Sequence, residues 1–267
     1  MTASLKLIWM VGIPTTFWCE NASAQWLDLM VLDLKSIKLP LSVLTALFSL
    51  IAPETAEADP MQCIDRSFVV DSNDPEMTDH LCAMATEVRG KLEACGLTQS
   101  RPLTIEMVDK VSHPMGDCLA YFDCEYDLVR VTDPASYKDL MGEDASYASL
   151  PVMVTLRALL THEITHAFLT QAAGDRPVPM VDQEYAAAAM ELEFMEEKWR
   201  KALINANPVS FPPREGLIDI WIYAFSPRKF AVNAWQHFSL AENGCSLIRK
   251  IVGGQKSFYK EVRPELQ

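Results

Sequence analysis

Residues 161–166 read THEITH, so they place two histidines, His162 and His166, four positions apart, with Glu163 directly after the first. Residues four apart on a helix share one face, so both imidazole rings can bind a single ion. Zinc takes imidazole nitrogens at about 2.0–2.1 Å and, in catalytic sites, keeps one position open for water. Glu163 is rotated off the ligand face and can act as a general base on the attacking water. This HExxH spacing predicts a Zn²⁺ site for metal-assisted hydrolysis.

The neighbours of the motif indicate that its helix is mostly buried. Leu159, Leu160, Ile164 and Phe168 surround the two histidines. The alternative, a surface helix whose histidines face water, does not fit so apolar a setting. Buried imidazoles need hydrogen-bond or metal partners.

A catalytic zinc needs a third protein ligand, and Glu184 is the preferred candidate. It lies 18 residues after His166, beyond an expected chain reversal at residues 174–179 and near the start of the returning helix. The alanines at 186–189 would let the two helices pack closely. The alternative for Glu184 is a first-turn glutamate favoured by the helix dipole. The substitutes as third ligand are Asp175, Glu191 and Glu193.

A hydrolase also needs a hydrogen-bond donor for the developing oxyanion. The candidates are Tyr185, Tyr223 and His237, of which Tyr223 and His237 are kept as predicted catalytic residues. Each has a structural alternative, because a tyrosine in an apolar helix and a single histidine often serve only packing. The cluster of Glu191, Glu193, Glu196 and Glu197 is expected to be a solvated helix face.

HExxH followed by a glutamate on the next helix resembles the gluzincin group of zinc metallopeptidases, which includes the thermolysin-like enzymes. The resemblance is specific over residues 156–191 and implies a zincin-like fold, zinc ligands His162, His166 and Glu184, and Glu163 as the base. One position departs from the pattern. Thermolysin-like enzymes carry an aspartate four residues after the glutamate ligand, where it orients the first histidine, and here that position is Ala188. A partner for His162 must then come from elsewhere.

Two shorter stretches add a second likeness. Residues 95–97, which read CGL before an expected strand, and residues 183–185, which read QEY, resemble an uncharacterised family of exported bacterial proteins of this shape.

The elements that must position these residues fall into two halves. Strands are expected at residues 68–70, 103–108, 118–122 and 128–131, and a helix at 75–94. Helices follow at about 151–171, 181–201, 217–225, 226–243 and 246–252. This order predicts an α+β fold. A small N-terminal mixed sheet with one helix comes first, and a helical half that carries the HExxH helix follows. The strand at 128–131 is the candidate edge at which an extended substrate could add a strand.

Residues 1–58 read as a leader and residues 59–267 as one domain. Two lysines, an apolar run and the A-x-A at 56–58 follow one another as in a secretory signal peptide, for which Met30 is the natural start. An uncleaved N-terminal anchor helix is the alternative.

Removing 58 of the 267 residues also removes Cys19, and six of the seven cysteines remain. An even set in an exported chain predicts disulfides, and Cys118 with Cys124 is the locally favoured pair.

The net charge and the pI limit the classes of partner that the protein is expected to bind. A net charge of −13 and a pI near 4.8 argue against nucleic acid and anionic membranes. The main hypothesis is a secreted or periplasmic zinc-dependent peptidase that acts on peptides or proteins and has no stable membrane association after leader removal. The alternatives are a zinc-binding but inactive envelope or interaction domain, and a disulfide-stapled binding domain without metal. The oligomeric state does not follow from the sequence.

Overall fold

The computed structural model describes residues 60–113, 116–141, 147–242 and 244–260, so the predicted leader lies outside it. The strands are β1 Met61–Gln62, β2 Phe68–Asp71, β3 Leu103–Val108, β4 Val111–His113, β5 Gly116–Cys118, β6 Ala120–Asp123 and β7 Leu128–Thr132. The α-helices are α1 Pro75–Ala94, α2 Tyr137–Leu140, α3 Val152–Ala173, α4 Met180–Phe194, α5 Glu197–Ala206, α6 Ile220–Phe225, α7 Pro227–Leu240 and α8 Gly244–Val252, and two 3₁₀ turns cover Pro134–Ser136 and Glu215–Leu217.

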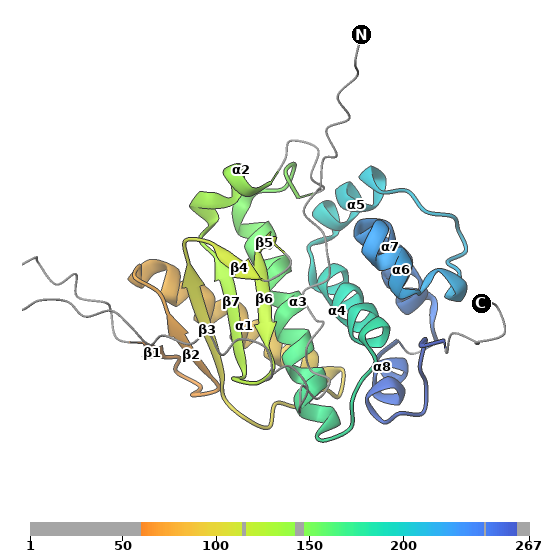
Figure 1. Ribbon diagram of the computed structural model, residues 1–267, viewed down its shortest axis with the longest axis horizontal. Coiled ribbons are helices and arrows are strands. Elements are labelled where there is room, and N and C mark those ends of the chain that lie inside the picture. Colours follow the sequence, from red (N-terminus) through yellow and green to blue (C-terminus); the bar gives the residue numbers. More distant parts are fainter. Residues whose placement is uncertain (1–59, 114–115, 142–146, 243, 261–267) are drawn as a thin grey trace, which may run out of the picture.

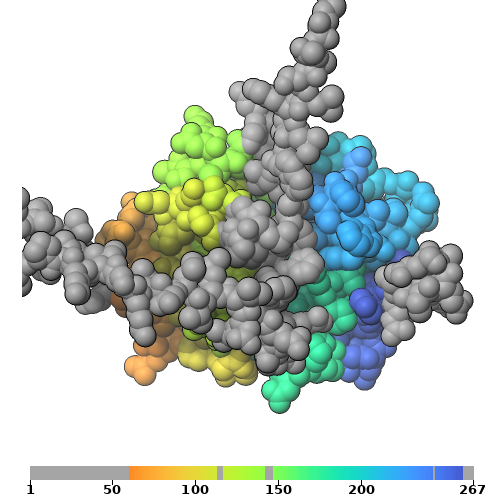
Figure 2. Space-filling view, viewed as in Figure 1, coloured from red at the N-terminus to blue at the C-terminus, as the bar shows by residue number. Residues whose placement is uncertain are grey.

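The chain forms an α+β fold with the sheet on one side and most helices on the other, as the sequence predicts (Figure 1). The sheet has the order β1-β2-β3-β7-β6, in which β2, β3 and β7 are parallel and the two edge strands are antiparallel to their neighbours. Helix α3 stands between the sheet and α4 (Figure 1). In the space-filling view the first elements and the last helices lie at opposite sides of the molecule (Figure 2).

Helix α1 spans the predicted residues because its ends carry strong local signals. The Asp74 side chain accepts a hydrogen bond from the backbone N–H of Glu76, and Pro75 occupies the first turn. Gly96 follows the helix with φ +89°, a conformation that favours glycine. The buried face of α1, which includes Leu81 and Val88, packs on β2 and α3. The apolar alternation in the central strands completes this core.

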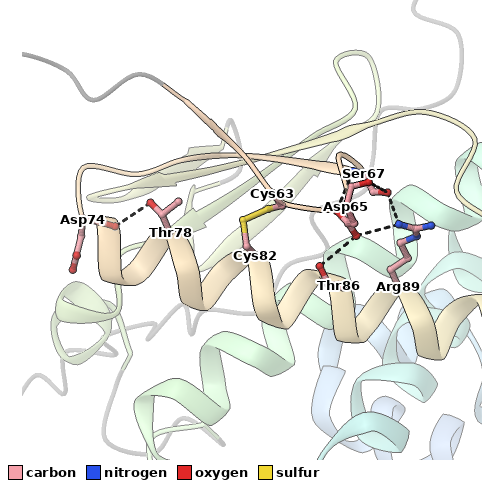
Figure 3. The surroundings of a disulfide bond; sticks show 8 residues. All are labelled: Cys63, Asp65, Ser67, Asp74, Thr78, Cys82, Thr86 and Arg89. Atoms are coloured by element: carbon pink, nitrogen blue, oxygen red, sulfur yellow. Dashed lines mark hydrogen bonds and ion pairs between the residues drawn. A yellow bond between two sulfur atoms is a disulfide. The ribbon is translucent and has the colours of Figure 1, made fainter.

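Two disulfides between described residues join segments that are distant in sequence. Cys63–Cys82 fastens the segment before β2 to α1, beside an ion pair between Asp65 and Arg89 (Figure 3). Cys95–Cys245 links the end of α1 to α8 across 150 residues. The predicted Cys118–Cys124 pair is wrong, because Cys118 is a free thiol. Cys118 belongs to β5, which pairs with β4 in a separate two-stranded sheet instead of with β7.

Two further expectations need correction. The helix expected at 181–201 is two helices, α4 and α5, because the backbone at Met195 is extended. The predicted edge strand at 128–131 is β7, which lies inside the sheet between β3 and β6. The edge strand on that side of the sheet is β6, which follows β7 in the strand order. Helix α3 packs against β6 and β7. Within the described part of the chain, no helix combines the length and the apolar character needed to cross a membrane.

Candidate metal centre

Helix α3 carries the two histidines on successive turns. Their ring centroids are 4.8 Å apart, and both side chains are buried, as the apolar neighbours predict. The helix ends at Ala173, and its cap residue Gly174 has a φ of +59°, which suits a residue without Cβ. The chain then reverses before Pro179, the residue that precedes α4. The predicted reversal between the two helices is therefore confirmed.

Helix α4 brings Glu184 to the two histidines. Its alanines at 186–189 are buried, which permits close packing on α3. The Nε2 atom of His162 lies 3.4 Å from Oε2 of Glu184, and Nε2 of His166 lies 3.7 Å from Oε1 of Glu184. One ligand atom from each of the three residues can be chosen so that all lie within 4.8 Å of one another. Ligands about 2.1 Å from a tetrahedral ion are about 3.4 Å apart, so the group has the size of a metal site.

Two buried atoms support a metal at this place. Nε2 of His166 and Oε2 of Glu163 have no hydrogen-bond partner among the described residues. A buried polar atom without a partner costs about 1–3 kcal/mol. A cation between His162, His166 and Glu184 would satisfy the imidazole, and water beside the cation would satisfy the carboxylate. These residues therefore fit a metal ion.

The partner of His162 that the sequence leaves open is Glu191. Nδ1 of His162 is 3.0 Å from Oε2 of Glu191, whose exposed fraction is 2%. The carboxylate accepts the Nδ1 proton, so loss of the Nε2 proton would leave the Nε2 lone pair for a bound metal ion. The expectation that Glu191 faces solvent is wrong, whereas Glu193, Glu196 and Glu197 are exposed as predicted. The missed signal is the spacing of seven between Glu184 and Glu191, which puts both on one helix face.

Glu163 lies beside the group of His162, His166 and Glu184 and close to the edge strand β6. Burial raises the pKa of its carboxyl to about 7, while a hydrogen bond from the backbone N–H of Phe122 on β6 acts in the opposite direction. A cation bound next to it would lower that pKa again. The residue predicted as the base thus has one oxygen near β6 and one that is free to meet a water molecule.

The structure brings Tyr223 to the site. Tyr223 is a buried residue of α6, and burial, followed by the charge and hydrogen bond of Glu184, raises the pKa of its hydroxyl well above the usual range. The carboxylate of Glu163 acts in the same direction. Tyr223 is therefore a hydrogen-bond donor at the ligand group.

The structure places His237 in different surroundings. Its Nδ1 lies 3.0 Å from the hydroxyl of Tyr185, and its ring packs on Phe258. Burial lowers its pKa, and the charges that act on it are those of Glu215 and Lys256. His237 and Tyr185 thus pair with each other, and both rings pack on Phe258, which follows α8.

Zinc binding is expected to release a proton and to strengthen as the pH rises. Burial opposes protonation of His162, but hydrogen bonds with Glu184 and Glu191 outweigh it and raise the pKa of His162 to about 10 in the metal-free protein. Burial lowers the pKa of His166 to about 4. Below about pH 10 the metal must displace the proton of His162, so the apparent Kd should fall about tenfold per pH unit near neutrality. Calorimetry in buffers of different ionisation enthalpy measures the released protons. A pH-independent Kd between about pH 6 and 8 would contradict this expectation.

Fold and site together define an α+β protein with a buried His-His-Glu group that could hold a metal ion. Residues 68–261 match the family described as "Family of unknown function (DUF6639)", and since this is more than half of the chain, the protein belongs to that family. No curated protein and no solved structure shows significant similarity to the chain.

Proposed function

We propose that the protein is an exported zinc-dependent peptidase with a zincin-like, gluzincin-type site. The observation that carries the proposal is the combination of the buried His162, His166 and Glu184 with the carboxylate of Glu163 beside them. A purely structural zinc is closed by four protein ligands and has no use for such a carboxylate. The two disulfides support export, because disulfides persist in oxidising compartments.

A zinc ion held by these three residues would supply Lewis-acid activation of the scissile carbonyl and of water. Glu163 takes a proton from the attacking water and delivers it to the leaving amine. The hydroxyl of Tyr223 donates a hydrogen bond to the carbonyl oxygen as negative charge develops there. His237 has no part in this scheme, since it pairs with Tyr185.

The edge strand β6 is the surface that we assign to the substrate. Among the strands that the structure describes, it pairs only with β7, and its Phe122 amide reaches Glu163. An extended peptide that adds a strand to β6 would lie across the base and the metal ligands.

The test is zinc analysis of the purified protein, followed by digestion of a peptide library. We expect one zinc ion per chain, cleavage that stops when a chelator removes the zinc, and recovery when zinc is returned. Bound zinc without cleavage of any peptide would favour the inactive interaction domain instead. A protein without metal would contradict both functions and favour the disulfide-stapled binding domain.

A further inference from the structure

The carboxylate of Glu191 is held on both of its oxygens. Oε2 faces Nδ1 of His162, and Oε1 accepts hydrogen bonds from the hydroxyl of Tyr147 and from Nη1 of Arg228, which lies 3.1 Å away. The exposed fraction of the Glu191 side chain is only 2%. The orientation of this carboxylate is therefore determined by protein groups and not by water.

Arg228 reaches Glu191 from a third helix. It is the second residue of α7, which begins at Pro227, and its guanidinium lies over the ring of Tyr147 at 4.0 Å from the centroid. Its Nη1 also donates to the Tyr147 hydroxyl, so arginine and tyrosine hold each other as well as the carboxylate. A guanidinium carries five N–H donors in a rigid planar fork, so it can lie over a ring and still donate to fixed acceptors, with less freedom than an ammonium on a flexible stem.

We propose that Arg228, together with Tyr147, is a positioning residue for the metal centre. Arg228 holds Glu191 in the orientation that accepts the Nδ1 proton of His162, so Nε2 of His162 stays directed at the metal position. Four segments are thereby joined in one hydrogen-bonded chain: the turn at Tyr147, α7, α4 and α3. The inference rests on the metal site of the proposed function but not on peptide cleavage.

The geometry explains why the carboxylate needs this support. Glu191 shares the surroundings of His162 with another carboxylate, because Glu184 lies 3.4 Å from Nε2 of that ring, and the negative charge of Glu191 also acts on Glu163. Without Arg228, Glu191 would keep only the neutral hydroxyl of Tyr147 on Oε1, and repulsion by its neighbours would favour another rotamer. His162 would then lose the acceptor that fixes its ring.

The test compares Arg228→Met with Arg200→Met. Arg200 is a matched control, because its guanidinium also lies over an aromatic ring, Trp235 at 4.9 Å, and its Nη1 donates to carbonyls at the end of α4. The probe is zinc itself, titrated against a chromophoric chelator on the full chain. We expect a Kd about 10- to 100-fold weaker for Arg228→Met, partial recovery in Arg228→Lys, and a Kd close to that of the unmodified protein for Arg200→Met.

A second readout reports the hydrogen bond directly. In the zinc-loaded protein the Nδ1 proton of His162 should give a low-field imidazole resonance, which Arg228→Met should broaden or shift and Arg200→Met should not. If Arg228→Met does not fold, Tyr147→Phe serves instead, because it removes one hydroxyl and should weaken zinc binding in the same direction.

Unchanged zinc affinity and an unchanged resonance in a folded Arg228→Met protein would overturn the inference. Failure to cleave peptides would count against the proposed peptidase alone. Absence of zinc binding in the unmodified protein would overturn both.

Discussion

Replacement of Glu163 by glutamine is expected to reduce peptide hydrolysis by about 10²- to 10⁴-fold, the usual contribution of a general acid–base group. Glutamine keeps the size of the side chain and one carbonyl oxygen, but it cannot take a proton from water. Its Oε1 can still accept the hydrogen bond from the Phe122 amide, so the local structure should persist. The rate with a cleavable peptide and the zinc content are the two measurements.

The control for this variant is Glu125→Gln, which makes the same chemical change at an exposed position in the turn between β6 and β7. It should retain full activity. If Glu163→Gln kept its zinc and also kept its activity, another group would have to be the base, and the proposed mechanism would be wrong.

Removal of the His166 imidazole is expected to abolish stoichiometric zinc binding. This ring is wholly buried and its Nε2 lies 3.7 Å from Glu184, so His166→Ala deletes a ligand and leaves a cavity between α3 and α4. The loss of affinity should exceed the roughly 10- to 100-fold effect of losing an outer hydrogen-bond partner. Equilibrium dialysis with zinc measures it.

The same variant should lose the stabilisation that zinc gives the folded chain. A ligand that binds only the folded state raises the unfolding temperature in proportion to the logarithm of its concentration over Kd. Added zinc should therefore raise the unfolding temperature of the unmodified protein and of His80→Ala, which removes an exposed histidine, but not that of His166→Ala. Equal zinc-dependent shifts in all three proteins would contradict the assigned ligands.

Much of the site could be predicted because its signals are local. The spacing of His162 and His166 fixes their common helix face, and the reversal before α4 places Glu184 opposite them. The bounds of α1 follow from its cap at Asp74 and from Gly96. Each of these features is determined by residues that are close together in the sequence.

The parts that could not be predicted depend on contacts between distant segments. Arg228 lies 37 positions after Glu191, and nothing in its own surroundings in the sequence indicates that it reaches that carboxylate. Glu191 itself sits in a run of glutamates that resembles a solvated surface, yet packing of α4 against α3 buries it. Cys118 and Cys124 are close in sequence, but Cys118 is a free thiol on β5, outside the main sheet, whereas Cys124 is disulfide-bonded.

The Cys95–Cys245 bond encloses every residue assigned to the site, from Phe122 on β6 to Arg228 on α7. A single backbone cut in any loop between these two cysteines would leave the two fragments joined covalently. If the protein is the peptidase proposed above, nicking of a surface loop by another copy would therefore not release a free half. The nicked chain would keep α3, α4 and α7 tethered to one another for as long as its surroundings remain oxidising.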